Sequence, residues 1–254
     1  HDITERLEQE QLQADFISMV SHELRSPLTS IKGSMGLLLS KAAGQLPPKA
    51  EGLLEIAHRN ADRLVLIIND ILDMEKISSG RLDFELETAD LSELVAESLR
   101  ANATAHQRFG LQIKCHGVDT PTYIETDANR IIQVLTNLMS NAAKFSKPGG
   151  TVEISVDKTP ENVCVSVRDE GMGIAPEDQH KIFQRFADMA NSDRATKGGT
   201  GLGLSICKAI VEGLGGTIDF VSKEGRGTTF TFTLPVKTRH SGPENDFERL
   251  ENVG

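Results

Sequence analysis

His22 and Glu23 stand side by side in the segment VSHELRSPLTSIKG, residues 20–33, and Pro27 follows inside an otherwise helical pattern. An imidazole beside a carboxylate is a pair that can serve nucleophilic or proton-transfer chemistry. Pro27 has no backbone N–H and crowds the carbonyl of Glu23, so we expect the helix to bend or loosen beside His22. Taken alone, the segment fits a surface histidine next to a tolerated kink slightly better than it fits a reactive centre.

A second candidate set lies in the segment NLMSNAAKF, residues 137–145. Asn137, Asn141 and Lys144 recur at helical spacing and therefore share one face of the expected helix. Amide groups and an ammonium group on an otherwise apolar helix suit a metal ion and phosphate oxygens. For any one of the three, a solvent-facing polar residue is the simpler interpretation.

The segment DEGMGI, residues 169–174, places a carboxylate directly after an expected strand. Asp169 could accept a hydrogen bond from an exocyclic amine such as that of adenine. Gly171 and Gly173 would let a ligand lie against the backbone. A plain glycine turn explains the same residues.

Two glycine-rich segments follow. KGGTGLGLSI, residues 197–206, runs into a helix whose first N–H groups can bind phosphate. It is not a Walker A motif, because no Gly-Lys-Ser/Thr follows, nor a Rossmann fingerprint, because the preceding strand is missing. EGRGTTFTF, residues 224–232, could be no more than the entry into a strand. Each motif is weak by itself, but chance explains all four in this order poorly.

The first 80 residues contain two long helical patterns that would place His22. Each has one apolar seam, and two antiparallel helices with one seam each cannot bury their own core. Pairing two such hairpins into a four-helix bundle solves this, so we expect a homodimer through residues 12–80. The seam residues are Ile3, Leu7, Ala14, Ile17, Ser21, Leu24, Leu28, Ile31, Met35 and Leu38, then Leu54, Ala57, Ala61, Leu64, Ile68 and Ile71.

Beyond residue 80 the pattern changes to mixed helix and strand. Helices are expected at 91–105, with an Asp90 or Ser92 cap, at 127–145 and at 202–216. Strands are expected at 111–115, 123–126, 152–156, 163–167, 217–222 and 228–234. One sheet with helices on one face, an α+β sandwich, accounts for this order.

Composition excludes several classes of protein. The chain has 254 residues, 38% of them hydrophobic and 25% charged, which indicates a soluble globular protein. A formal net charge of -10 argues against nucleic acid as a partner. The three cysteines form no metal motif and fit a reducing compartment. No apolar run approaches the ~20 residues of a membrane span, so we expect a cytoplasmic chain and leave open a membrane anchor upstream.

Taken in order, SHELRSPLT, NLMSNAAKF, DEGMGI, IFQRF, GGTGLGLSI and GRGTTF resemble the H, N, G1, F, G2 and G3 boxes of sensor histidine kinases. The resemblance implies an α+β multidomain fold, in which an antiparallel hairpin forms a dimeric four-helix bundle. An α/β-sandwich ATP-binding domain like that of Hsp90, gyrase and MutL would follow. The expected divisions are a coiled-coil linker from an upstream PAS-like sensor (1–11), a dimerisation and phosphotransfer domain (12–80), an ATP-binding domain (81–236) and a tail or linker (237–254).

The resemblance also implies the chemistry of the opening segment. His22 would take the γ-phosphoryl group of ATP, with Glu23 orienting the imidazole and accepting its other proton. The phosphate would pass to an aspartate of a response regulator receiver domain, docked along the helix at Thr29, Lys32 and Gly33. Ser26 stands where members that also dephosphorylate this partner usually carry Thr or Asn, so it is the candidate for a phosphatase activity.

For the nucleotide, the resemblance implies that Asp169 binds adenine, Asn141 ligates Mg²⁺ and Lys144 binds phosphate. Arg185 would neutralise the transferring phosphoryl group, with Asn137 nearby. The full expected set is Asn137, Asn141, Lys144, Asp169, Gly171, Gly173, Ile174, Arg185, Gly199, Thr200, Gly201, Leu202, Gly203, Leu204 and Thr228.

This sequence departs from the family pattern in the expected lid, residues 187–200. Ala187 and Asp188 stand where an aromatic residue and an arginine are frequent, which leaves Arg185 and Lys197 as the lid contacts. Phe183 and Phe186 are expected to pack at the base of the lid.

Two alternatives to a kinase remain. One is a dimeric scaffold that binds nucleotide only to change shape, and every box that the chemistry needs argues against it. The other is an Hsp90- or MutL-like ATPase, which would carry glutamate where this chain has Asn137.

Overall fold

The computed structural model describes residues 2–42, 44–186 and 200–236, without the side chains of residues 2–18, 22, 105 and 108. The chain divides into two compact units, one made of residues 1–84 and 174–213 and the other of residues 85–173 and 214–254. Residues 174–213, expected within the ATP-binding domain, are thus grouped with the helical hairpin. The domain divisions drawn from the sequence stay predictions.

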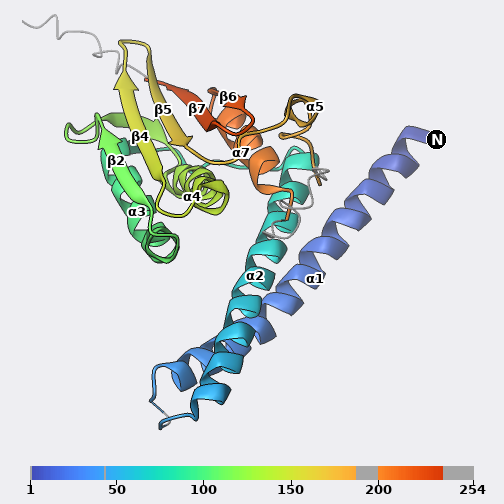
Figure 1. Ribbon diagram of the computed structural model, residues 1–254. Coiled ribbons are helices and arrows are strands. Elements are labelled where there is room, and N and C mark those ends of the chain that lie inside the picture. The colour runs from blue at the N-terminus through green and yellow to red at the C-terminus, as the bar shows by residue number, and fades with distance from the viewer. Residues whose placement is uncertain (1, 43, 187–199, 237–254) are drawn as a thin grey trace, which may run out of the picture. The chain divides into compact units, whose positions relative to one another are not determined.

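The first unit is built on two long helices, α1 (Asp2–Leu39) and α2 (Pro48–Ser78), and also holds α5 (Pro176–Gln179) and α7 (Gly203–Gly213) (Figure 1). Helix α1 continues through Pro27 without a break. Just beyond it, Thr29 Oγ1 donates to the carbonyl of Arg25 at 2.8 Å and Ser30 Oγ to that of Ser26 at 3.3 Å. Such back-bonding frequently accompanies helix bending, so this stretch carries two features that weaken a regular helix.

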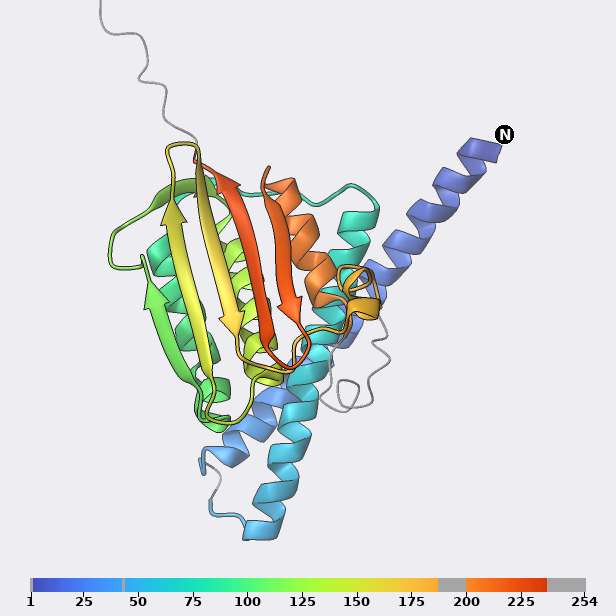
Figure 2. The same cartoon turned by 45° about the horizontal axis from the view of Figure 1, so that its top comes forward.

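The second unit contains a five-stranded sheet in the order β2-β4-β5-β7-β6, in which only the β2–β4 pair is parallel. Figure 2 shows helices α3 and α4 on one face of this sheet. A separate antiparallel pair joins β1 to β3. The elements are β1 (Glu87–Asp90), α3 (Leu91–Arg108), β2 (Gln112–His116), β3 (Tyr123–Thr126), α4 (Ala128–Phe145), β4 (Thr151–Lys158), β5 (Asn162–Asp169), β6 (Thr217–Lys223) and β7 (Gly227–Pro235).

Apolar and polar side chains alternate along the strands, so that one face of the sheet is buried. Val165, Val167 and Phe232 are buried, whereas the facing hydroxyls of Ser155 and Ser166, 2.6 Å apart, lie on the other side of the pleat. Helix α4 supplies the opposite layer of the core with Ile131, Leu135, Leu138 and Ala142. The predicted α+β sandwich with helices on one face is confirmed.

Most predicted elements are present, with two additions. Strand β1 (ETAD) and the short helix α5 (PEDQ) were not predicted, because these four-residue stretches are mostly polar and show no apolar pattern. Of the two caps considered for α3, Asp90 is the one used, since its carboxylate accepts from the backbone N–H of Ser92 at 3.0 Å. In the described part of the chain no helix has both the length and the apolar character needed to cross a membrane.

Candidate functional site

His22 lies within α1, and its side chain is among those that are not described. Its neighbours Glu23 and Ser26 are exposed. Arg25, one turn further on, donates from Nη2 to Oδ1 of Asn69 on α2 at 2.8 Å. This hydrogen bond fixes the segment of α1 that follows His22 against α2 at the level of Asn69.

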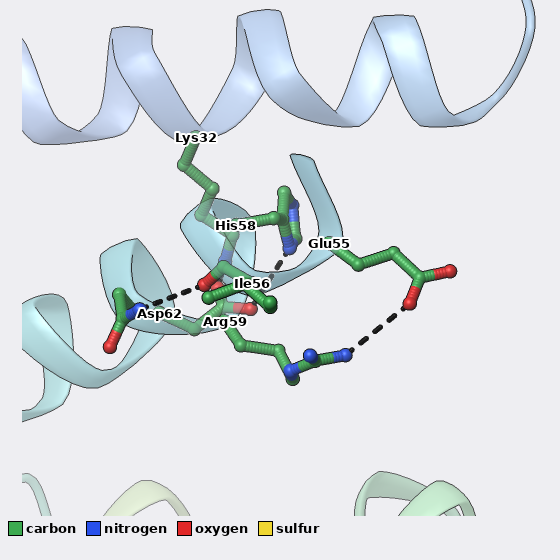
Figure 3. A network of polar contacts seen from close by, with 7 residues as sticks. Lys32, Glu55, Ile56, His58, Arg59 and Asp62 are labelled. Atoms are coloured by element: carbon green, nitrogen blue, oxygen red, sulfur yellow. Dashed lines mark hydrogen bonds and ion pairs between the residues drawn. The ribbon is translucent and has the colours of Figure 1, made fainter. Parts of the chain in front are cut away.

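A second contact repeats the same pairing of the two helices. Lys32 Nζ lies 2.8 Å from Oδ1 of Asp62, whose other carboxylate oxygen is 3.3 Å from Nδ1 of His58 (Figure 3). Arg25 and Lys32 on α1 are separated by the same number of residues as their partners Asn69 and Asp62 on α2, which runs in the opposite direction. The two contacts therefore define a single register along the hairpin.

The predicted seam is only partly buried within one chain. Ser21, Ala61 and Ile68 are buried, but Leu24, Ile31 and Leu64 are each about half exposed, at 51%, 52% and 49%. A row of exposed apolar residues along two packed helices is what a partner surface leaves bare in a single chain. Among the described side chains, the predicted seam is therefore buried at some positions and partly exposed at others, and its role as a dimer surface stays a prediction.

On the second unit, Asn137, Asn141 and Lys144 lie half-buried on one side of α4, between its buried apolar residues. The ammonium group of Lys144 lies 5.0 Å from the centre of the Phe145 ring. The three polar residues therefore line one stripe of a helix whose other side forms the core.

Asp169 ends strand β5 and is buried, with 6% of its surface exposed. Its Oδ1 accepts from the backbone N–H of Gly171 at 2.8 Å. A side chain at Gly171 would collide with the Phe145 carbonyl, and Gly173 has φ +67° with the Lys223 carbonyl in the way of any Cβ. The protein's own backbone therefore requires glycine at both positions, and their contact with a ligand stays a prediction.

The structure brings three of the predicted motifs together. Met172 N–H donates to the Phe145 carbonyl at the end of α4, at 3.3 Å, and its own carbonyl accepts from Gly225 N–H at 2.7 Å. Asp169 is paired across the sheet with Thr228. Residues from α4, from the 169–173 loop and from the start of β7 therefore meet at one end of the sheet.

In the first unit, Ile174 is buried and Arg185 is exposed. Phe183 is half-buried with the Lys208 ammonium 5.7 Å from its ring centre. Phe186 is 67% exposed with φ +53°, contrary to the expectation that it packs. Its N–H donates to the Gly201 carbonyl at 3.1 Å, so its backbone is tied to the start of the glycine-rich segment.

Of the glycine-rich set, Thr200, Gly201, Leu202, Gly203 and Leu204 are described, and they lead into α7. Leu202 is buried and its N–H donates to Thr200 Oγ1 at 3.2 Å. The remaining lid predictions, including Ala187, Asp188, Lys197 and Gly199, lie outside the described residues, as does the tail 237–254.

Sequence reasoning missed one polar residue next to this set, Asp70 of α2. Its Oδ2 accepts from Thr200 Oγ1 at 2.7 Å. Burial raises the pKa of this carboxyl and so does nearby Asp73, while the Thr200 hydrogen bond lowers it. An acidic residue flanking a helical seam gives no sequence signal that would separate it from a solvated one.

Comparison with known proteins agrees with this arrangement. The family model described as histidine kinase-, DNA gyrase B- and HSP90-like ATPase matches residues 126–238. The model for the His Kinase A (phospho-acceptor) domain matches residues 12–80. An ATPase-type α/β domain joined to a phospho-acceptor helical domain is the class of protein that these matches define.

Whole relatives are longer than this chain. It is 36% identical over 242 residues to the sensor histidine kinase WalK of Bacillus subtilis, covering 93% of this chain and 39% of WalK. It is 35% identical over 227 residues to the circadian input-output histidine kinase CikA of Synechococcus elongatus, covering 88% of this chain and 30% of CikA. The chain thus spans less than half the length of either relative.

Solved structures give the same result. The catalytic domain of histidine kinase ThkA is 32% identical with a TM-score of 0.53, covering 59% of this chain and 95% of that domain. Full-length ShkA in complex with AMPPNP is 26% identical with a TM-score of 0.69, covering 87% of this chain and 45% of ShkA. The chain belongs to the histidine kinases of two-component signalling, with a phospho-acceptor domain followed by an ATPase-type domain. The predicted family, fold class and enzyme class are confirmed, and dimerisation and partnership with response regulators are supported as general features of such domains.

Proposed function

We propose that this chain binds one Mg²⁺-bound ATP and transfers its γ-phosphoryl group to His22. The observation that carries the proposal is the meeting of Asp169, Thr228 and the end of α4 at one end of the sheet. Asp169 is buried at the end of β5, and a carboxylate accepts hydrogen bonds, so its chemistry suits the exocyclic amine of adenine. Thr228, which is paired with Asp169 on the neighbouring strand β7, would assist in binding the base.

The residues of α4 fit a magnesium ion bound together with phosphate. Among the described residues, no group of three His, Cys, Asp or Glu side chains is placed to hold a metal. Mg²⁺ characteristically takes one or two protein oxygens and completes its shell with phosphate oxygens and water. The half-buried amides of Asn137 and Asn141 supply such oxygens, and Lys144 adds a cation for the phosphate. When bound, the ion would neutralise phosphate charge.

The transfer step makes one bond and breaks one. A neutral ring nitrogen of His22 attacks the γ-phosphorus, an N–P bond forms, and the P–O bond to ADP breaks. The proton on the other ring nitrogen is released toward Glu23, whose exposed carboxylate follows His22 in sequence. Arg185 is exposed, and its positive charge would stabilise the negative charge on the phosphoryl group during transfer.

Asp169→Asn tests the base pocket. Losing a charged hydrogen bond at a buried site costs about 1.5–3 kcal/mol, so affinity for both ATP and ADP should fall roughly ten- to a hundredfold in calorimetric titrations. Asp157→Asn, an exposed carboxylate on neighbouring β4, is the matched control and should bind normally. An unchanged ADP dissociation constant in Asp169→Asn would contradict this role.

We infer that two chains pair through residues 12–80 and that phosphate passes from His22 to a receiver-domain aspartate. The half-exposed apolar seam supports the homodimer. An upstream sensor domain of PAS type would supply the signal, and Ser26 is the candidate for a phosphatase activity. Gly33 has open space around its Cα, which suits the close approach of a partner helix.

Receiver docking is best tested at Thr29. Lys32 is paired with Asp62, so its reversal would also disturb the hairpin, whereas the Thr29 hydroxyl bonds only to its own helix. Thr29→Tyr should slow phosphotransfer severalfold without slowing autophosphorylation. Ser40→Tyr, an exposed hydroxyl beyond the end of α1, is the control. Equal loss of both rates would assign Thr29 to the mechanics of the bundle.

A scaffold without catalysis and an ATPase that passes phosphate to water remain the competing functions. A scaffold would form no phosphohistidine. An ATPase would release phosphate steadily without labelled protein, and it would lack the activating glutamate of that class, since Asn137 stands there.

A further inference from the structure

Thr200 and the first turn of α7 lie against one face of α2, within the same compact unit (Figure 1). Thr200 Oγ1 donates to Asp70 Oδ2 at 2.7 Å, and Ser205 Oγ lies 3.7 Å from Met74 Sδ. Asp70 and Met74 are four residues apart and therefore share one face of the helix. The segment is held at two points, one of them ionisable.

This docking site is level with the phosphoacceptor residue. The contacts Arg25–Asn69 and Lys32–Asp62 set the register of the two antiparallel helices. In this register, a residue three positions before Arg25 on α1 lies opposite the residue three positions after Asn69 on α2. His22 is therefore level with Leu72, and Asp70 is only two residues from that level, or about 3 Å along the helix axis. Contact with α2 places Thr200 near the height of the reactive histidine.

The carboxylate of Asp70 lies beside hydrogen-bond donors that could also bind a phosphate. The Thr200 hydroxyl is both the donor to Asp70 and the acceptor of Leu202 N–H, immediately before α7 begins at Gly203. The first N–H groups of a helix and a nearby hydroxyl favour negative charge, whether it comes from a carboxylate or from a phosphate. Two anions cannot share these donors without repulsion in a half-buried position.

We propose that Asp70 is a regulatory latch, whose carboxylate holds the Thr200 segment on α2 in the nucleotide-free chain and is displaced by the phosphates of ATP. The latch rests on the proposed function, because it takes residues 200–204 as part of the phosphate-binding segment. Nucleotide binding would then favour release of the Thr200 segment from α2, and release of this segment would favour nucleotide binding. Breaking the latch should tighten nucleotide binding, and the gain should depend on phosphate.

The test is calorimetric titration of the full chain with a non-transferable ATP analogue and, separately, with AMP. In Asp70→Ala the analogue should bind about 2- to 10-fold more tightly, the range that corresponds to one net hydrogen bond. Affinity for AMP should change less than twofold, because the base and first phosphate do not compete with Asp70. Asp70→Asn keeps an acceptor without the charge and should give an intermediate gain.

Asp62→Asn is the matched control, since it removes another α2 carboxylate that contacts Lys32 and His58 and lies two turns away. Unchanged or weaker analogue binding in Asp70→Ala and Asp70→Asn, with normal circular dichroism, would overturn the latch and leave the proposed nucleotide site intact. An equal gain for AMP would overturn it as well. Failure of the unsubstituted chain to bind the analogue would overturn both proposals.

Discussion

The helical hairpin and the five-stranded sheet solve the problem of burial in different ways. In the sheet unit, Phe232, Val165 and Leu138 are fully buried by their own chain. In the hairpin, Leu24, Ile31 and Leu64 stay about half exposed, while polar contacts such as Arg25–Asn69 set the register. The sheet has a core of its own, whereas the described part of the hairpin leaves apolar residues exposed.

The difference matches the two tasks of a histidine kinase. In the proposed function Asp169 would bind the base, a task that suits a rigid element, and Asp169 is held by backbone contacts at the end of a buried strand. His22 would have to meet first the ATP and then a partner protein. It therefore suits a helix pair whose packing is incomplete and whose α1 carries Pro27 and back-bonded hydroxyls near His22.

The largest expected effect is on the sheet. Phe232 lies on β7, the strand between β5 and β6, and its ring is fully buried. Phe232→Ala should therefore lower the free energy of unfolding by about 3–5 kcal/mol. Urea unfolding followed by circular dichroism measures this loss. Val221→Ala, on the adjacent strand and 79% exposed, should change it by less than about 0.5 kcal/mol. Equal losses would contradict the assignment of the core.

A smaller effect is expected from the hairpin, and it should appear in association. Leu64→Asp places a charge on the half-exposed seam, and burial of a leucine contributes about 1.5–3 kcal/mol. The dimer dissociation constant in analytical ultracentrifugation should therefore rise at least tenfold. Leu66→Asp is the control, because Leu66 is 62% exposed and lies off the seam. Identical dissociation constants for the two variants would argue against a seam dimer.

The smallest effect concerns pH and His106 of α3. This histidine is 5% exposed with Nε2 unpaired among the described residues, and burial lowers its pKa. The unfolded chain then binds the proton more readily, so the free energy of unfolding should fall as pH drops below about 6.5 and level off below the lowered pKa. His106→Gln should flatten this part of the curve. His116→Gln, an exposed histidine of the same unit, leaves His106 in place and should preserve the fall.

Much of this architecture could be predicted from the sequence. The alternation of β5 and β7 and the periodicity of α4 identified the core correctly, because burial on one face imposes those patterns. The contact of Asp70 with Thr200 could not be predicted, since it joins residues 130 positions apart through two side chains. The roles of Gly171 and Gly173 were assigned to a ligand because a sequence does not reveal which backbone passes close to a glycine.

The central claim is that ATP phosphorylates His22, and incubation with γ-labelled ATP tests it most directly. The unsubstituted chain should acquire label that is acid-labile and alkali-stable, as an N–P bond is. His22→Gln should acquire none while its affinity for ADP changes less than twofold, because His22 lies in α1, far in sequence from every nucleotide motif. Acid-labile label that persists on His22→Gln, or its absence from the unsubstituted chain, would contradict the account.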